Sequence, residues 1–169
     1  MSKAILLSIK PKYVADILNG KKTIEIRKQI PKCKLPIDVY IYLTKNGGTL
    51  SCGNCELPYL NGKVVAKFTL RKIEEIKTHH ICFIVNEKEI AEKSCLTKEE
   101  LNEYLNLIKL NPKTKELYCG YAWHIEDLVI FDKPKELNEF HKINYKNRSY
   151  TTKGNIAEFR EMNFKQLLG

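Results

Sequence analysis

The sequence predicts an α+β fold built on a small mixed β-barrel, with a helical insert near residues 86–111. Short apolar or alternating segments that suit strands occupy both flanks of the chain, whereas residues 74–116 change to a different, partly helical pattern. The chain contains no internal repeat and no low-complexity segment. Strands on both sides of a helical segment imply pairing between distant parts of the chain, which is typical of an α+β fold.

Near the N-terminus, the pattern predicts a strand, a helix and a second strand in succession. Ala4–Ile9 is a compact apolar run and is expected to form a buried strand. The next residues, 11–19, begin with a proline, show apolar spacing of i, i+3 and i+4, and are followed by Gly20, so we expect a short helix. Residues Thr23–Arg27 then alternate between apolar and polar side chains, as a strand with one polar face does.

The remaining elements follow from the same kinds of pattern. Ile37–Leu43 and the long alternating segment Lys63–Ile73 are predicted strands, separated by a glycine-containing loop over residues 46–62. A Thr-x-x-Glu capping box at Thr97 predicts a helix that ends near residues 111–112. Leu117–Ile125 and Leu128–Phe131 are predicted to be the last two strands.

Length and composition indicate one globular domain that remains in the cytoplasm. The chain has 169 residues, of which 43% are hydrophobic and 29% are charged. No segment approaches the roughly 20 apolar residues that cross a bilayer, and the apolar stretch after Lys3 is too short for a secretory signal. We therefore expect no membrane partner.

Six cysteines raise the question of disulfides or a metal site. Without a secretory signal we expect free thiols. The segment Cys52-Gly-Asn-Cys55 has the spacing of half a zinc knuckle, but the chain lacks a second Cys-x-x-Cys pair. A zinc site would need the fold to bring further ligands to this segment, and the candidates are Cys33, Cys82, His79 and His80. We therefore predict no metal and no cofactor, with Cys52 and Cys55 as the weak zinc alternative.

The net charge of +9 is spread unevenly along the chain. Residues 1–45 carry ten Lys or Arg against three acidic residues, residues 46–132 carry eleven against thirteen, and residues 133–169 carry eight against four. Two basic ends are typical of a surface that binds phosphates. A lysine-rich composition gives the same count without any partner, so charge alone leaves both interpretations open.

The most informative segment is Gly20-Lys21-Lys22-Thr23-Ile24-Glu25-Ile26-Arg27. It combines a helix stop with two lysines, a carboxylate and an arginine, and strand alternation places Glu25 and Arg27 on one face. Lys22 lies where the turn would bring it toward that face. The alternative interpretation is a solvated strand face with a surface ion pair, which contributes at most about 1 kcal/mol.

The pattern Gly-x-Lys-x-x-Glu-x-Arg after a short helix resembles the signature of ASCH domains in the PUA-like superfamily. Gly20, Lys22, Glu25 and Arg27 match its four positions. The late strand around residues 120–125, followed by Lys-Pro at 133–134, also looks like the family. The resemblance suggests an ASCH, PUA-like domain over residues 1–140 and a basic C-terminal extension over residues 141–169, packed on the same domain or trailing it.

This resemblance implies a PUA-like β-barrel with a basic cleft beside the first helix, where RNA or a modified nucleotide binds. The expected partner is thus RNA or a nucleotide-like ligand, while the oligomeric state stays open. Tyr121 and Trp123 alternate with smaller residues and would share a face on which bases stack, although a lone Trp is often a core residue and His124 is more often structural than catalytic. The candidate ligand-binding residues are Lys10, Lys22, Thr23, Glu25, Arg27, Tyr121 and Trp123.

Two other function classes remain open. Some small members of the superfamily are amidohydrolases acting on acetylated cytidine, and Lys22 matches their lysine, but Glu25 occupies the position of their threonine. Their glutamate is matched only loosely by Glu89 or Glu92. In a ribonuclease-like enzyme, Lys22 and Glu25 would be the catalytic acid and base. The third class is a protein-interaction adaptor.

Overall fold

The computed structural model describes residues 3–52, 54–76, 78–79, 83–84, 86–105, 120–142 and 157–161. The chain forms two compact units, each assembled from separate segments. The first unit comprises Met1–Ala15, Pro36–Thr69 and Asp127–Gly169, and the second comprises Asp16–Leu35 and Leu70–Glu126. Within the described residues, no helix has both the length and the hydropathy that membrane crossing requires.

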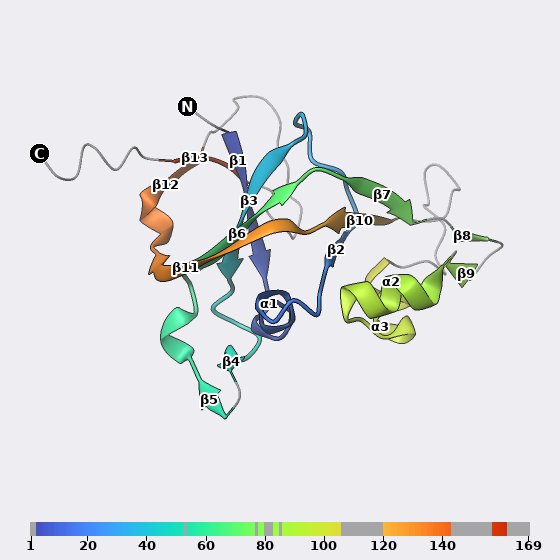
Figure 1. Ribbon diagram of the computed structural model, residues 1–169, viewed down its shortest axis with the longest axis horizontal. Coiled ribbons are helices and arrows are strands. Elements are labelled where there is room, and N and C mark those ends of the chain that lie inside the picture. The colour runs from blue at the N-terminus through green and yellow to red at the C-terminus, as the bar shows by residue number, and fades with distance from the viewer. Residues whose placement is uncertain are drawn as a thin grey trace, which may run out of the picture. The chain divides into compact units, whose positions relative to one another are not determined.

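The first unit contains a six-stranded mixed sheet in the order β11-β6-β3-β1-β13-β12 (Figure 1). The first strand, β1, pairs in parallel with β3 and antiparallel with β13. Because β1 and β3 lie inside the sheet, their apolar runs are buried, as the sequence predicted for a compact apolar strand. The strands are β1 Lys3–Ile9, β3 Ile37–Leu43, β6 Val64–Leu70, β11 Glu126–Lys135, β12 Phe140–Lys142 and β13 Ala157–Glu161.

A cluster of aromatic and aliphatic side chains packs on one face of this sheet. The ring centroid of Tyr40 lies 5.1 Å from that of Phe140 and 6.1 Å from that of Phe131.

The segment predicted as a plain loop, residues 46–62, contains regular structure as well. It folds into a hairpin of β4 (Ser51–Cys52) and β5 (Cys55–Glu56), followed by a 3-10 turn, η1 (Pro58–Leu60). A second 3-10 turn, η3 (Leu137–Glu139), precedes β12.

Helix α1 spans Pro11–Leu18, within one residue of its predicted end. Its stop is made by Gly20, whose φ of 71° lies in the left-handed region that glycine adopts without strain. The backbone N–H of Gly20 donates to Ile17 at 2.9 Å, and those of Lys21 and Lys22 donate to Asp16 at 2.9 and 3.0 Å. This turn fixes the direction in which the chain enters the next strand.

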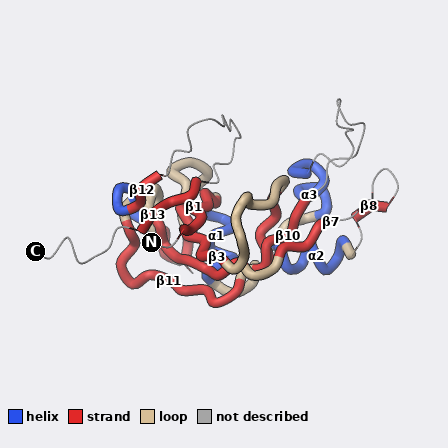
Figure 2. The backbone as a smooth tube through the Cα atoms, turned by 90° about the horizontal axis from the view of Figure 1, so that it is seen from above, coloured by secondary structure: helices blue, strands red, loops and turns tan. Residues whose placement is uncertain are grey.

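The second unit is built on a three-stranded antiparallel sheet in the order β2-β10-β7. These strands are β2 Ile24–Arg27, β10 Gly120–His124 and β7 Ile73–Ile76. Two helices, α2 (Glu87–Ser94) and α3 (Lys98–Leu105), lie beside β7 and β10 in Figure 2. A short hairpin of β8 (Thr78–His79) and β9 (Phe83–Ile84) precedes them.

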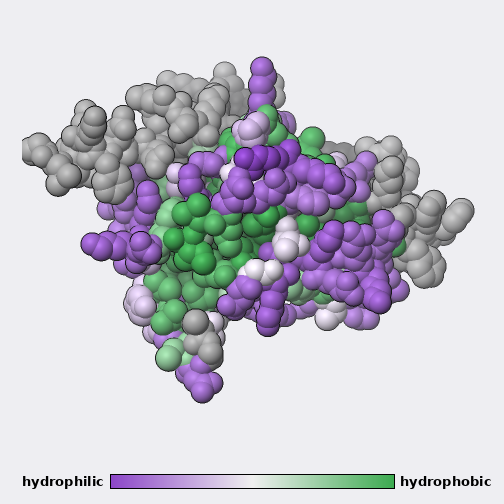
Figure 3. Space-filling model, in the orientation of Figure 1, coloured by the Kyte–Doolittle hydropathy of each residue, from purple (hydrophilic) through white to green (hydrophobic). Residues whose placement is uncertain are grey.

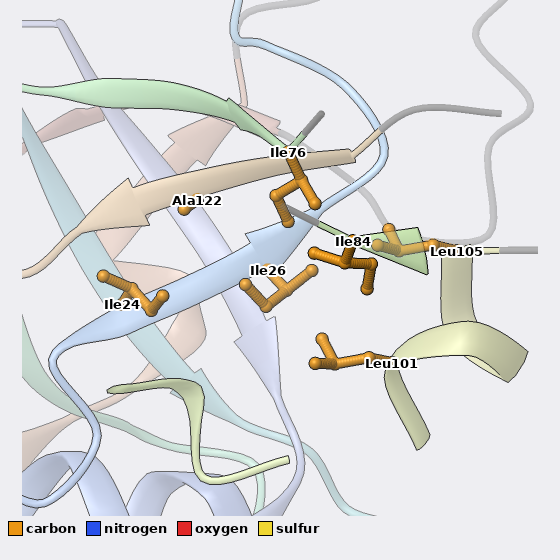
Figure 4. Close-up of a cluster of buried hydrophobic side chains, with 7 residues drawn as sticks. All are labelled: Ile24, Ile26, Ile76, Ile84, Leu101, Leu105 and Ala122. Atoms are coloured by element: carbon orange, nitrogen blue, oxygen red, sulfur yellow. The ribbon is translucent and has the colours of Figure 1, made fainter. Parts of the chain in front are cut away.

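A hydrophobic cluster joins this sheet to the helices. Ile26 of β2 lies near Ile84 and the α3 residues Leu101 and Leu105, and Ile24 belongs to the same cluster further along the strand (Figure 4). The even-numbered residues of β2 are therefore buried against apolar side chains, which leaves Glu25 and Arg27 for the other face. Burial of each large aliphatic side chain contributes about 1.5–3 kcal/mol.

Two predicted element boundaries need correction. The segment Lys63–Ile73 was predicted to be one strand, but β6 ends at Leu70 and β7 begins at Ile73 in a different sheet. Arg71 and Lys72 are consecutive charged residues that interrupt the apolar alternation, and the prediction extended the strand across them. The segment Leu128–Phe131, predicted as a separate strand, is the centre of the longer β11.

The helical region near residues 86–111 contains two helices, of which only the second was predicted by its cap. The capping box is present: Thr97 N donates to Glu100 Oε2 at 2.9 Å, and Glu100 N donates to Thr97 Oγ1 at 3.2 Å. The predicted continuation to residues 111–112 and the start of the strand predicted at 117–125 lie outside the described residues.

The α+β class is confirmed, whereas the closed barrel is not. Among the described strands, the six-stranded sheet has two ends, β11 and β12, and β2, β10 and β7 form a sheet of their own. Periodicity indicates which face of a strand is buried, but it does not specify which strands pair. From the C-terminal extension, the structure describes residues 141–142 and 157–161, and β13 pairs with β1.

Candidate functional site

Lys22 is a buried cation held between a helix end and a strand. It follows the turn at Gly20 and its side chain is only 2% exposed. The Nζ atom donates to the backbone O of Ser94, the last residue of α2, at 2.7 Å, and lies 3.2 Å from Glu25 Oε2. A buried ammonium is costly unless it is paired and hydrogen-bonded, and both partners are supplied here.

Glu25 connects Lys22 to Arg27 through its two carboxylate oxygens. Its Oε1 lies 2.9 Å from an Nη atom of Arg27, while Oε2 faces Lys22. The side chains of Glu25 and Arg27 are 10% and 16% exposed, so Arg27 keeps the most contact with solvent of the three. We call Lys22, Glu25 and Arg27 the charged triad; two cations and one carboxylate leave it with a net charge of +1.

Tyr104 of α3 is a further neighbour of the triad. Burial raises the pKa of the Tyr104 hydroxyl, while the positive charge of Arg27 and a hydrogen bond from its side chain act in the opposite direction. The Nζ atom of Lys28 lies 5.2 Å from the Tyr104 ring centroid. Sequence reasoning assigned Tyr104 only to the helix face, because nothing in its local spacing connects it with Arg27.

The aromatic residues of β10 lie on the same sheet face as Glu25 and Arg27. In the antiparallel register, Tyr121 is opposite Arg27 and Trp123 is opposite Glu25, and directly opposed residues share a face. Tyr121 is half-buried, whereas Trp123 is 0% exposed and so offers no surface for base stacking. Among the described residues, its indole N–H has no acceptor. A ligand-binding role for Trp123 stays a prediction.

A family model described as the ASCH domain matches residues 7–135 of the chain. The matched range covers most of the chain and includes the whole charged triad. The chain belongs to the ASCH domain family. The resemblance inferred from Gly20, Lys22, Glu25 and Arg27 is thereby confirmed.

Solved structures of other ASCH proteins have the same fold. The ASCH protein from Zymomonas mobilis is 18% identical, with a TM-score of 0.53 over 80% of this chain and 74% of that chain. Crystal structures of two single-substitution variants of that protein each give a TM-score of 0.51 at 18% identity, covering 80% of this chain and 76% and 75% of theirs. At this identity the likeness concerns the fold alone. No curated protein matches the chain.

In this ASCH domain, a pocket of about 210 Å³ lies between the β2-β10-β7 sheet and α2. It is lined by Ile24, Ala122 and Ile76 from the strands and by Ile90 of α2, together with polar residues that include Glu89 and Lys93. None of the charged triad lines it; Glu25 and Arg27 lie on the opposite face of β2 from Ile24, and Lys22 precedes the strand. This pocket is therefore distinct from the cleft that the sequence predicted beside the first helix.

His124 and its neighbour Glu74 both line this pocket. Its Nε2 atom lies 2.5 Å from Glu74 Oε2, and Lys72 Nζ lies 2.7 Å from Glu74 Oε1. Hydrogen bonds from Lys72 and then from His124 lower the pKa of Glu74. His124 thus has a side-chain partner, and its structural role stays a prediction.

The other candidate residues are distributed over the two units. Lys10 is exposed and belongs to the first unit, where its backbone oxygen accepts hydrogen bonds from the first turn of α1. Thr23 is exposed and directly precedes β2, and its backbone N–H donates to Lys93 O at 2.8 Å. Glu89 pairs with Lys93 at 2.6 Å, and Glu92 is exposed on α2.

The zinc alternative rests on residues of which the structure describes only some. Cys52 and Cys55 are register partners in the β4–β5 hairpin. Over the part of the chain that the structure describes, no three His, Cys, Asp or Glu residues are grouped as metal ligands. Cys82 and His80 lie outside the described residues.

Proposed function

We propose that this ASCH domain binds RNA or a modified nucleotide through the charged triad. The observation that supports this function is the bridging of Lys22 and Arg27 by one buried carboxylate, with a net positive charge left over. If Glu25 were paired with one cation only, the pair would be neutral and would not attract a phosphate. PUA-like folds are often linked to RNA binding, so family membership favours the same ligand class. A PUA-like barrel with α2 and α3 as its insert, a basic cleft and a cytoplasmic location belong to this proposal.

The three residues have different roles in this proposal. Arg27, the most exposed of them, contacts a phosphate with its planar fork of N–H groups. Glu25 holds the guanidinium in place, so that less side-chain freedom is lost when the ligand binds. Lys22 is too deeply buried for a direct phosphate contact; its role is to hold the Glu25 carboxylate in place through their ion pair. Lys10, Thr23 and Tyr121 remain candidates for further ligand contacts.

Substitution of Arg27 tests the proposal. Arg27→Lys keeps the charge but removes the fork, and we expect about tenfold weaker binding of a short single-stranded RNA, equivalent to about 1.4 kcal/mol. Fluorescence anisotropy with a labelled oligonucleotide measures this change. Arg71→Lys is the matched control, because Arg71 is a half-exposed arginine that also pairs with a glutamate, Glu126, at 3.6 Å. If both variants bind the RNA as tightly as the parent protein does, Arg27 does not contact the RNA and the proposal is wrong.

A hydrolase acting on a nucleoside or RNA is the second candidate. The observation in its favour is the 3.2 Å distance between Lys22 Nζ and Glu25 Oε2, which brings a potential acid and base within proton-transfer reach. Incubation with acetylated cytidine and with RNA, followed by chromatographic analysis of the products, tests it. If neither substrate is converted above the level of a Glu25→Gln variant, the triad has a binding function only.

A further inference from the structure

Tyr104 of α3 is a large aromatic side chain that stays partly at the surface. Its helix neighbours Leu101 and Leu105 are buried in the cluster under β2, whereas Tyr104 is 39% exposed. The hydroxyl is the covered end, because burial raises its pKa and the Arg27 side chain donates a hydrogen bond to it. The exposed surface of Tyr104 therefore belongs to the ring and to the methylene group that carries it.

Two basic side chains contact this ring from the end of β2. Arg27 of the charged triad holds the hydroxyl. The Nζ atom of Lys28, the next residue along the chain, lies 5.2 Å from the ring centroid. Lys28 is exposed, and an exposed lysine side chain has many rotamers open to it, so its ammonium is a mobile cover of the ring. A planar group of a ligand can take its place.

A nucleic-acid base is a group that displaces such a cover. The contact between an ammonium and an aromatic ring at an exposed site is weaker than the stacking of a base on the same ring. The displaced ammonium of Lys28 remains near Arg27, where it attracts a phosphate of the same ligand. A nucleotide thus gains a stacking contact and a second cation in exchange for one weak contact within the protein.

The charges of α3 limit which part of a ligand can reach the ring. Of the eight residues of this helix, three are glutamates and one is a lysine. On the face that Figure 3 shows, the surface over α2 and α3 is mainly hydrophilic. The carboxylates of α3 repel phosphates, whereas Arg27 and Lys28 attract them. The uncharged base is therefore the part of a nucleotide that fits on Tyr104.

We propose that Tyr104 is the platform on which an unpaired base of the bound RNA stacks, next to the phosphate that Arg27 holds. This role rests on the proposed function and narrows its ligand to single-stranded RNA, because the bases of a duplex are already paired and stacked. The sequence predicted a stacking platform on Tyr121 and Trp123. Trp123 is 0% exposed, whereas Tyr104 presents its ring beside Arg27.

Substitution of Tyr104 tests the stacking. Tyr104→Leu keeps an apolar, helix-forming side chain but removes the ring, and we expect about tenfold weaker binding of a single-stranded oligouridine. Tyr104→Phe loses only the hydrogen bond with Arg27 and should bind within about threefold of the parent protein. Tyr59→Leu is the matched control, because Tyr59 is a 65% exposed tyrosine of η1 in the first unit. Fluorescence anisotropy measures the affinities, and thermal denaturation checks that each variant is folded.

An oligomer of the same length without bases separates the stacking from the phosphate contact. Tyr104→Leu should bind this sugar-phosphate chain as tightly as the parent protein does, whereas Arg27→Lys should bind both probes more weakly. The parent protein should also prefer the single strand to an RNA duplex of the same length, and Tyr104→Leu should lose most of this preference.

The outcomes distinguish this role of Tyr104 from the proposed function. If Arg27→Lys weakens RNA binding while Tyr104→Leu binds as tightly as Tyr59→Leu, the stacking is wrong and the phosphate contact stands. If Tyr104→Leu weakens the chain without bases as much as the oligouridine, Tyr104 only positions Arg27, and the stacking is again wrong. If the parent protein binds neither probe, or if Arg27→Lys has no effect, the proposed function fails and the stacking beside Arg27 fails with it.

Discussion

Glu25 has the contacts of a positioning residue and also of a base, and the two roles differ in what its loss would do. Its carboxylate lies between two cations and is almost completely buried. If both cations lost this partner, the site would hold two buried positive charges close together, which is far more costly than an exposed ion pair broken at the surface.

Substitution of Glu25 by Gln distinguishes these roles. If the residue only orients Arg27, a neutral amide preserves its shape and one hydrogen bond, and RNA binding should weaken by about 1–2 kcal/mol. If it is a general base, any turnover should fall by about 100-fold or more while binding stays nearly unchanged. Both quantities are measured on the same variant, with Glu126→Gln as the control for an exposed glutamate paired with an arginine. No change in either quantity would mean that the triad is purely structural.

At the level of single residues, the sequence predicted which side chains share a face but not how deeply they lie. Strand alternation placed Glu25 and Arg27 together, and their 2.9 Å contact agrees with it. Buried Lys22 donates a hydrogen bond to the backbone O of Ser94, 72 residues away in the sequence. Arg27 has a second distant neighbour, Tyr104 of α3. Contacts between distant segments leave no trace in local spacing, so these neighbours were missed.

Among the secondary-structure elements, α3 is defined most clearly by its own sequence. Thr97 and Glu100 form reciprocal hydrogen bonds that satisfy two backbone N–H groups at the start of the helix. The helix in turn places Leu101 and Leu105 in the cluster under β2. A weaker cap therefore affects the packing that supports the strand of the charged triad.

Removal of this cap should lower stability by a predictable amount. Thr97→Ala leaves the Glu100 N–H without its acceptor, and we expect the free energy of unfolding to fall by about 1 kcal/mol. Thr97→Ser keeps a hydroxyl at the same position and should cost no more than a few tenths of that amount. Urea denaturation followed by circular dichroism measures both. A loss of stability that is equal in the two variants would show that the methyl group, and not the hydrogen bond, accounts for the effect.

Element boundaries were predictable where a residue marks them chemically. Pro11 and Gly20 delimit α1, and Thr97 begins α3 one residue before the first helical position. The break between β6 and β7 has no proline, glycine or cap to mark it; Arg71 and Lys72 interrupt the apolar alternation there, but two charged residues in a row also occur within strands. Helix α2 was not separated from α3, because its N-cap, Asn86, makes no side-chain capping hydrogen bond.

Over the whole molecule, composition and patterning were sufficient for the fold class but not for the topology. The α+β class follows from the order of strand-like and helix-like segments. How the strands divide into two sheets depends on pairing between segments far apart, such as β1 with β13 and β2 with β10. The net charge is likewise a property of the whole chain, and it bears on how RNA binding depends on salt.

The net charge of +9 leads to the last prediction, which concerns salt. If RNA is held mainly by phosphate contacts, binding releases condensed counterions, and the logarithm of affinity falls by about 0.7 per contacted phosphate for each tenfold rise in salt. With about three phosphates in contact, a fourfold rise in salt should weaken binding of a single-stranded oligonucleotide about twentyfold. Anisotropy titrations at two salt concentrations measure this, and a free nucleoside serves as the control without phosphates. An oligonucleotide affinity that is as insensitive to salt as that of the nucleoside would indicate that the site recognises a base rather than a phosphate, and that Arg27 acts through a hydrogen bond to that base.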